Sequence, residues 1–132
     1  MSRSGYSDDC DYNYLYLYRG MVERAIKGKR SQEFFKELAR EMDAMPDKRL
    51  IANDLVAENG EACAIGVVCK ARGLDTKRID ECDPERVGAL VGISRSVAAE
   101  IEYLNDEDGP AEETPEQRWT RMRKWVQEQI IP

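Results

Sequence analysis

Signals that begin and end α-helices recur along this chain and constrain its fold more than any other feature. The clearest is Thr114-Pro115-Glu116-Gln117, which combines an N-cap, a proline at the first helical position and a glutamine that completes a capping box. Asp83-Pro84-Glu85 is a second helix start, and Gly73 and Gly92 are typical helix ends. These signals bracket segments whose apolar residues are spaced three and four apart, so the sequence predicts an all-α fold.

Six helices follow from these signals and form a compact bundle. Ser31 and Ser94 are expected to be N-caps, and Lys29 and Arg30 are placed at the carboxyl end of the first helix. Four alternating tyrosines in residues 12–18 would also fit a strand, but the apolar spacing favours a helix there. The predicted helices cover approximately residues 11–27, 31–44, 61–72, 83–92, 94–104 and 114–130.

The predicted segments differ in how they contribute to the core. Residues 61–72 are apolar nearly all round, which is typical of a buried central helix that begins at Glu61. Residues 48–57 fit either a helix or two short extended pieces, and both alternatives stay open. The last helix carries a single apolar stripe that should dock on the core, formed by Trp119, Met122, Trp125, Val126 and Ile130.

A length of 132 residues fits one domain, because two cores of half this size would each be too small to offset the entropy of ordering them. We therefore predict a single helical domain over residues 1–132, with a polar amino-terminal segment at 1–10 and an acidic loop at 105–114. The hydrophobic fraction of 42% is enough for a core that needs neither metal nor disulfide.

The sequence contains no histidine, which excludes Ser-His-Asp and Cys-His nucleophiles and the commonest catalytic metal ligand. Its four cysteines lack paired CxxC spacing, and the acidic run at Asn105–Gly109 lacks the ligand spacing of a calcium loop. We expect no metal, no cofactor and no enzymatic activity. An enzyme based on carboxylates is the third possibility after the two described below. Without a signal peptide or an apolar span, the chain is expected in the cytoplasm with reduced thiols.

Residues 83–104 resemble a DNA-binding helix-turn-helix, with a turn at Gly92-Ile93-Ser94. Arg95 and Ser96 would be the principal contacts to DNA, and Ala99 and Glu102 would also face the groove. Charge argues against this function, because eight carboxylates and no basic residue lie between Arg95 and Arg118, and the net charge of the chain is −6. Nucleic acid is therefore an unexpected partner, and a DNA-binding regulator is kept only as the alternative function.

Binding residues are more plausible in the amino-terminal segment and in the acidic loop. Five tyrosines between Tyr6 and Tyr18 exceed what one helix face can bury, and exposed tyrosine is typical of binding surfaces. Two basic groups, residues 19–30 and 118–124, are interpreted as solvated helix faces. The predicted contact surface joins the amino-terminal segment to the acidic loop and would meet a basic partner; its residues are Tyr6, Asp8, Asp9, Asp106, Glu107 and Asp108.

Several motifs, taken together, resemble small uncharacterised proteins encoded by tailed bacteriophages and prophages. They are residues 2–9 (SRSGYSDD), 48–52 (KRLIA), 63–66 (CAIG), 103–107 (YLNDE), 114–116 (TPE), 118–119 (RW) and 125–126 (WV). The resemblance covers most of the chain and transfers no functional residue. It implies a phage accessory protein in the bacterial cytoplasm, and we expect it to bind and modulate a host or defence protein. The alternative becomes a helix-turn-helix regulator of phage transcription.

Overall fold

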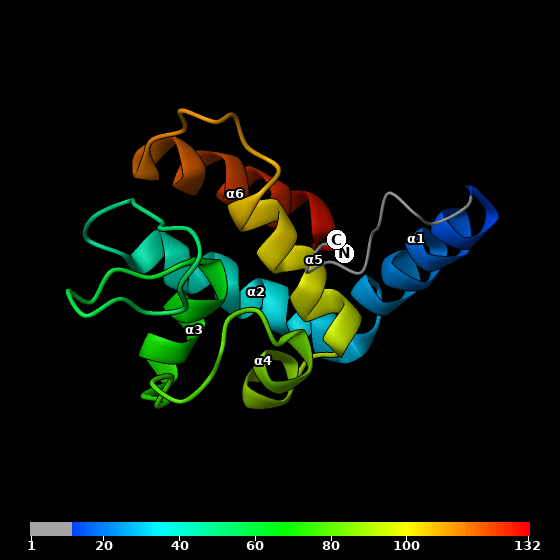
Figure 1. Ribbon diagram of the computed structural model, residues 1–132, viewed down its shortest axis with the longest axis horizontal. Coiled ribbons are helices and arrows are strands. Elements are labelled where there is room, and N and C mark those ends of the chain that lie inside the picture. The colour runs from blue at the N-terminus through cyan, green and yellow to red at the C-terminus, as the bar shows by residue number, and fades with distance from the viewer. Residues whose placement is uncertain (1–11) are drawn as a thin grey trace.

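The computed structural model describes residues 12–132, with side chains from Tyr16 onward, and confirms the all-α prediction. Within these residues there are six helices and no strand, and the only β-type pairing is an isolated bridge between Val56 and Ala62. Figure 1 shows the order of the elements: α1 (Tyr12–Ile26), α2 (Lys29–Ala44), α3 (Ala64–Arg72), α4 (Pro84–Val91), α5 (Arg95–Asp106) and α6 (Pro115–Gln129).

The core draws buried side chains from all six helices, and the predicted burial of α3 is confirmed. Six consecutive residues of α3, Ala64 to Cys69, are buried. Gly66 is required there, because a Cβ at this position would lie 1.8 Å from the backbone oxygen of Leu55. The absence of a side chain therefore lets the segment between α2 and α3 cross directly over α3.

The predicted caps on the second half of the chain are confirmed. Asp83, Ser94 and Thr114 each accept a hydrogen bond from a backbone N–H in the first turn of α4, α5 and α6, and Thr114 with Gln117 forms the capping box. Gly73 and Gly92 end α3 and α4 in the left-handed conformation, with φ of 70° and 84°. Local sequence chemistry therefore determines these boundaries.

Three predicted boundaries are wrong. The helix α2 begins at Lys29 behind an extended Gly28, so Ser31 lies buried within the first turn instead of capping it. The helix α3 begins at Ala64 with Cys63 as its N-cap, and Glu61 lies outside it. The helix α5 continues to Asp106, which shortens the acidic loop by two residues.

The segment between α2 and α3 takes the extended alternative, without forming a strand. Its backbone is held by hydrogen bonds within the segment, including Ile51 N–H to the Ala62 carbonyl at 3.0 Å and Cys63 N–H to the Leu55 carbonyl at 3.1 Å, and by a long-range bond from Leu50 N–H to the Pro115 carbonyl at 3.1 Å. The side chains of Leu50 and Leu55 are buried, which anchors the segment to the core.

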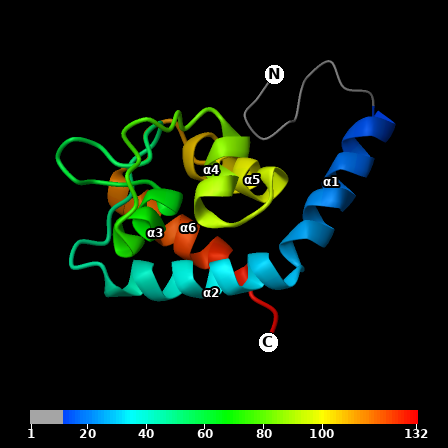
Figure 2. The same ribbon diagram turned by 90° about the horizontal axis from the view of Figure 1, so that it is seen from below.

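The first helix stands apart from the other five. Figure 2 shows that α1 joins the start of α2 and points away from the rest of the molecule. Its contact with the core is made near its carboxyl end, where Val22 and Ile26 are buried and Arg19 forms an ion pair with the buried Glu100 of α5. None of the described helices is long and apolar enough to cross a membrane.

Candidate functional site

The densest set of polar contacts is centred on Asn105, near the end of α5. Its side chain is buried, and its Oδ1 accepts a hydrogen bond from the Ala64 backbone N–H at 3.1 Å, next to the start of α3. Its Nδ2 donates to the Ile51 carbonyl at 2.9 Å and to Asp106 Oδ1 at 2.7 Å. One amide side chain therefore joins α5, α3 and the segment between α2 and α3.

Two arginines of α6 complete this arrangement, which we call the Asn105 hub. Arg118 donates to the Asn105 carbonyl at 3.1 Å and to the Leu50 carbonyl at 3.2 Å. Arg121 donates to the Leu104 carbonyl at 2.5 Å and reaches the Glu113 carboxylate at 2.6 Å. The interpretation of residues 118–124 as a solvated face is therefore wrong for these two arginines, because they satisfy backbone carbonyls that the end of α5 leaves without helical partners.

The hub brings together residues from several segments of the chain. Residues from 48–52, 63–66, 103–107 and 114–119 meet there, and Arg49 also bridges Glu61 at 3.0 Å and Glu116 at 2.5 Å. The contact between Arg49 and Glu116 connects residues that are 67 positions apart in the chain. The hub accordingly acts as the structural junction of the fold.

The thiols near this junction are poor nucleophiles. Burial raises the pKa of Cys63 well above its usual range, and nearby Asp106, Glu81 and Glu102 raise it further. Burial also raises the pKa of Cys69 to about 11. Both groups therefore remain protonated thiols at neutral pH. Among the residues that the structure describes, no cluster of three cysteines and carboxylates could hold a metal ion.

The acidic residues predicted to bind a partner divide into two kinds. Asp106 is half-buried and accepts a hydrogen bond from the Asn53 backbone N–H at 3.2 Å, so it belongs to the hub. Glu107 and Asp108 are exposed at the start of the loop between α5 and α6, and Glu112 is exposed further along it. Tyr6, Asp8 and Asp9 lie outside the described residues.

The loop itself is held from within by one internal carboxylate. Glu113 has a side chain only 3% exposed, and it receives Arg121 at 2.6 Å and Arg118 at 3.3 Å. The hydrogen bond from Arg121 is the main cause that lowers the pKa of Glu113, so the group is ionised at neutral pH. The exposed carboxylates therefore project from a loop whose base is fixed.

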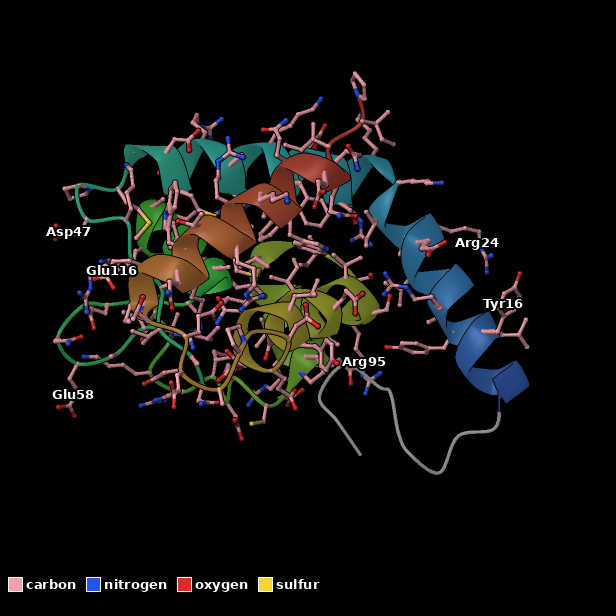
Figure 3. All side chains as sticks on the ribbon, turned by 90° about the horizontal axis from the view of Figure 1, so that it is seen from above. Tyr16, Arg24, Asp47, Glu58, Arg95 and Glu116 are labelled. Carbon is pink, nitrogen blue, oxygen red and sulfur yellow. The ribbon has the colours of Figure 1, made fainter. Side chains whose placement is uncertain are left out.

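The helices α4 and α5 do form the predicted hairpin, but α5 is enclosed. Of the four side chains expected at a DNA groove, Arg95 is exposed and Ser96 is half-buried, while Ala99 and Glu102 are buried. The expectation that Ala99 and Glu102 face outward is wrong because α1 and α3 also pack against α5. Figure 3 shows Arg95 at the edge of the molecule.

A hollow of about 270 Å³ lies between the carboxyl end of α2 and the segment before α3. Its two cations are already engaged, since Arg49 pairs with Glu61 and Glu116 and Lys70 donates to the Gly60 carbonyl at 2.6 Å. The hollow therefore offers no uncommitted cation to an anionic ligand.

The outer face of α1 is the apolar surface that the sequence analysis did not single out. Tyr16 and Leu17 are 70% and 69% exposed, and Met21 is 43% exposed. Figure 3 shows Tyr16 and Arg24 on the side of α1 that points away from the molecule. The exposure of Tyr16 confirms that the tyrosine-rich stretch cannot bury all of its rings. The sequence contained one indication of this surface: Gly20 lies in the middle of a helix, where glycine is unfavourable unless packing or function requires it.

No protein-family model, curated protein or solved structure matches this chain.

Proposed function

We propose that this chain is a non-enzymatic accessory protein, encoded by a phage as its resemblance implies, that binds a basic surface of a host or defence protein. The contact is made by the exposed carboxylates of the loop between α5 and α6. The observation that carries the proposal is the pinned loop: Arg118 and Arg121 hold Glu113 inside it, and Glu107, Asp108 and Glu112 are exposed on it.

A pinned loop favours binding for an energetic reason. Ordering a flexible loop upon association costs conformational entropy, and a loop held at its base has already lost most of that freedom. Carboxylates presented in this way accelerate the encounter with a basic partner and suppress acidic ones. The net charge of −6 supports the same polarity of partner.

The buried state of α5 makes the DNA-binding alternative less favourable. A recognition helix must enter the major groove with several side chains exposed, and α5 offers Arg95 while Ala99 and Glu102 are buried. The carboxylates that follow would repel the phosphate backbone.

The experiment is capture from host lysate by the full chain, followed by association-rate measurements with the captured protein once purified. The double variant Asp108→Lys with Glu112→Lys should slow association by tenfold or more, and raising the salt concentration should slow the unchanged protein. The melting temperature should stay nearly constant, because both side chains are exposed.

A matched control separates position from net charge. Glu33→Lys with Glu128→Lys alters two exposed carboxylates on α2 and α6, and like the loop variant it takes the net charge from −6 to −2. Equal slowing by both double variants would mean that net charge alone is responsible and would contradict a role for the loop. Capture that ignores both salt and the loop variant would place the interface elsewhere.

A further inference from the structure

We propose that the outer face of α1 is a self-association surface, on which two copies of the chain pack their α1 helices antiparallel with Gly20 at the two-fold axis. This inference goes beyond the proposed function and does not depend on it. It starts from Gly20, which is less favourable than alanine in the middle of a helix. A Cβ at this position would meet only the flexible end of Arg24, at 3.4 Å.

Packing among residues 12–132 therefore does not account for this glycine. A hollow of about 230 Å³ surrounds it on the outer face of α1, lined by Tyr16, Leu17, Arg19, Gly20, Glu23 and Arg24. Glycine on a helix surface allows another backbone to approach closely. The exposed side chains of Tyr16, Leu17 and Met21 supply the apolar area that such an approach would bury.

The arrangement of residues around Gly20 is complementary to itself. With about 100° and 1.5 Å per residue, Leu17 and Met21 lie on one flank of the outer face and Glu23 lies on the other, while Arg19 turns toward Glu100 of α5. An antiparallel two-fold axis at Gly20 brings each flank against the same flank of the second copy. Leu17 then lies beside the second copy's Met21, offset by about 3 Å along the helix.

Charge selects the antiparallel direction. Arg24, Lys27, Lys29 and Arg30 are exposed around the junction of α1 and α2, and none of them pairs with a carboxylate of another described residue. Parallel packing would bring the four cations of one copy against the four of the other. Antiparallel packing places the two clusters at opposite ends of the contact, because each junction follows the carboxyl end of its own α1. Figure 2 shows helices α2 to α6 on one side of α1 and joined to its carboxyl end. Antiparallel packing therefore also keeps these helices of the two copies apart.

The contact is small, and this sets its expected strength. Two facing helices of 15 residues bury no more than the ~1,200 Å² total typical of weak complexes. We therefore expect a reversible monomer–dimer equilibrium in the micromolar range. In a closed two-fold dimer each contact occurs twice, and no larger assembly should follow.

The test is sedimentation velocity of the full chain from low micromolar to near-millimolar concentration. The unchanged protein should shift from monomer to dimer, and Leu17→Ser should weaken association about tenfold or more, as expected for loss of a buried leucine. Gly20→Leu should also prevent dimerisation while keeping the helical circular dichroism, since leucine is a good helix former and open space surrounds the site. The control is Ile131→Ser, which changes another exposed aliphatic side chain, 49% exposed, and should leave the equilibrium unchanged.

Disulfide trapping tests the direction. In a background with Cys10→Ser and Cys82→Ser, Gly20→Cys should cross-link into a dimer. Tyr16→Cys should not, because antiparallel packing separates the two position-16 residues by about 12 Å along the axis, beyond the ~7 Å limit of a disulfide. Equal cross-linking at both positions would overturn the antiparallel arrangement. A chain that stays monomeric at every concentration, or a Leu17→Ser variant that dimerises normally, would overturn the self-association itself, whatever the capture experiment shows.

Discussion

The helices α1 and α6 are each 15 residues long, and each carries aromatic and basic side chains at amphipathic spacing, yet the fold uses them in opposite ways. The arginines of α6 bind carboxylates and carbonyls, and its tryptophans pack against the core, with the ring of Trp125 5.5 Å from that of Phe35. On α1, Tyr16 is mostly exposed and Arg24 makes no ion pair with a described carboxylate.

The difference lies in what each helix covers. The helix α6 lies across the end of α5 and the segment before α3, where backbone carbonyls and Glu113 need positive donors. The outer face of α1 covers none of the residues that the structure describes. Similar amphipathic patterns can therefore produce a structural clamp or an available surface, depending on the polar groups that the neighbouring elements leave unsatisfied.

The largest contrast should come from two methionines, one in each helix. Met122 of α6 is fully buried, so Met122→Ala should lower the free energy of unfolding by about 2–5 kcal/mol through lost burial and a residual cavity. Met21 of α1 is 43% exposed, and Met21→Ala should change it by less than about 0.5 kcal/mol. Urea unfolding at low protein concentration measures both, and similar losses would show that α1 is as deeply integrated as α6.

Two arginines should give a smaller contrast of the same kind. Arg121→Ala leaves Glu113 and the Asn105 carbonyl with Arg118 alone and deprives the Leu104 carbonyl of its side-chain donor, so we expect a loss of about 2–3 kcal/mol. Arg24→Ala removes an exposed side chain that pairs with no described carboxylate and should be nearly neutral. A neutral Arg121→Ala would refute the clamp, and chemical denaturation of the two variants side by side decides it.

The smallest expected effect is the loss of unfolding free energy at acidic pH. The pKa values of Glu113, Glu37 and Asp43 are lowered mainly by hydrogen bonds from Arg121, Arg72 and Arg123. Their stabilisation is therefore complete at neutral pH and is lost as the pH falls below 4.5, the ordinary glutamate value, and through the lowered values of the folded state.

The pH dependence can be assigned by variant. Unfolding free energies measured across this acid range should fall less steeply for Arg121→Ala than for the unchanged chain, because the share of Glu113 is already lost. The slope should be unaltered in Arg24→Ala. An unchanged slope in both variants would mean that Glu113 is not held by Arg121 in solution.

Local sequence chemistry was sufficient for most of the fold. Thr114 with Gln117, Asp83 and Ser94 each satisfy backbone donors within one turn, so their caps could be predicted without any tertiary information. The start of α2 could not, because Gly28 provides no side-chain cap and its neighbours Lys29 and Arg30 resemble a helix end.

The candidate surfaces were only partly accessible to sequence reasoning. The side chain of Asn105 bonds to Ala64 and Ile51, which lie 41 and 54 residues away in the chain, and to the adjacent Asp106. Nothing in the local sequence distinguishes Asn105 from a solvated loop residue. The enclosure of Glu102 is likewise a result of packing between helices. For α1, the sequence showed a glycine at position 20, but it did not predict that the side chains around this glycine would be exposed.

The Asn105 hub also has a consequence for the order in which the chain can fold during synthesis. Residues 48–63 are held by the Pro115 carbonyl, by Arg118 and by Asn105, all of which leave the ribosome more than fifty residues after Leu50. Until then α3 and the segment before it have apolar side chains and backbone groups without their final partners. Completion of the core must therefore wait for the last third of the chain, and the nascent amino-terminal half is exposed to chaperones throughout that interval.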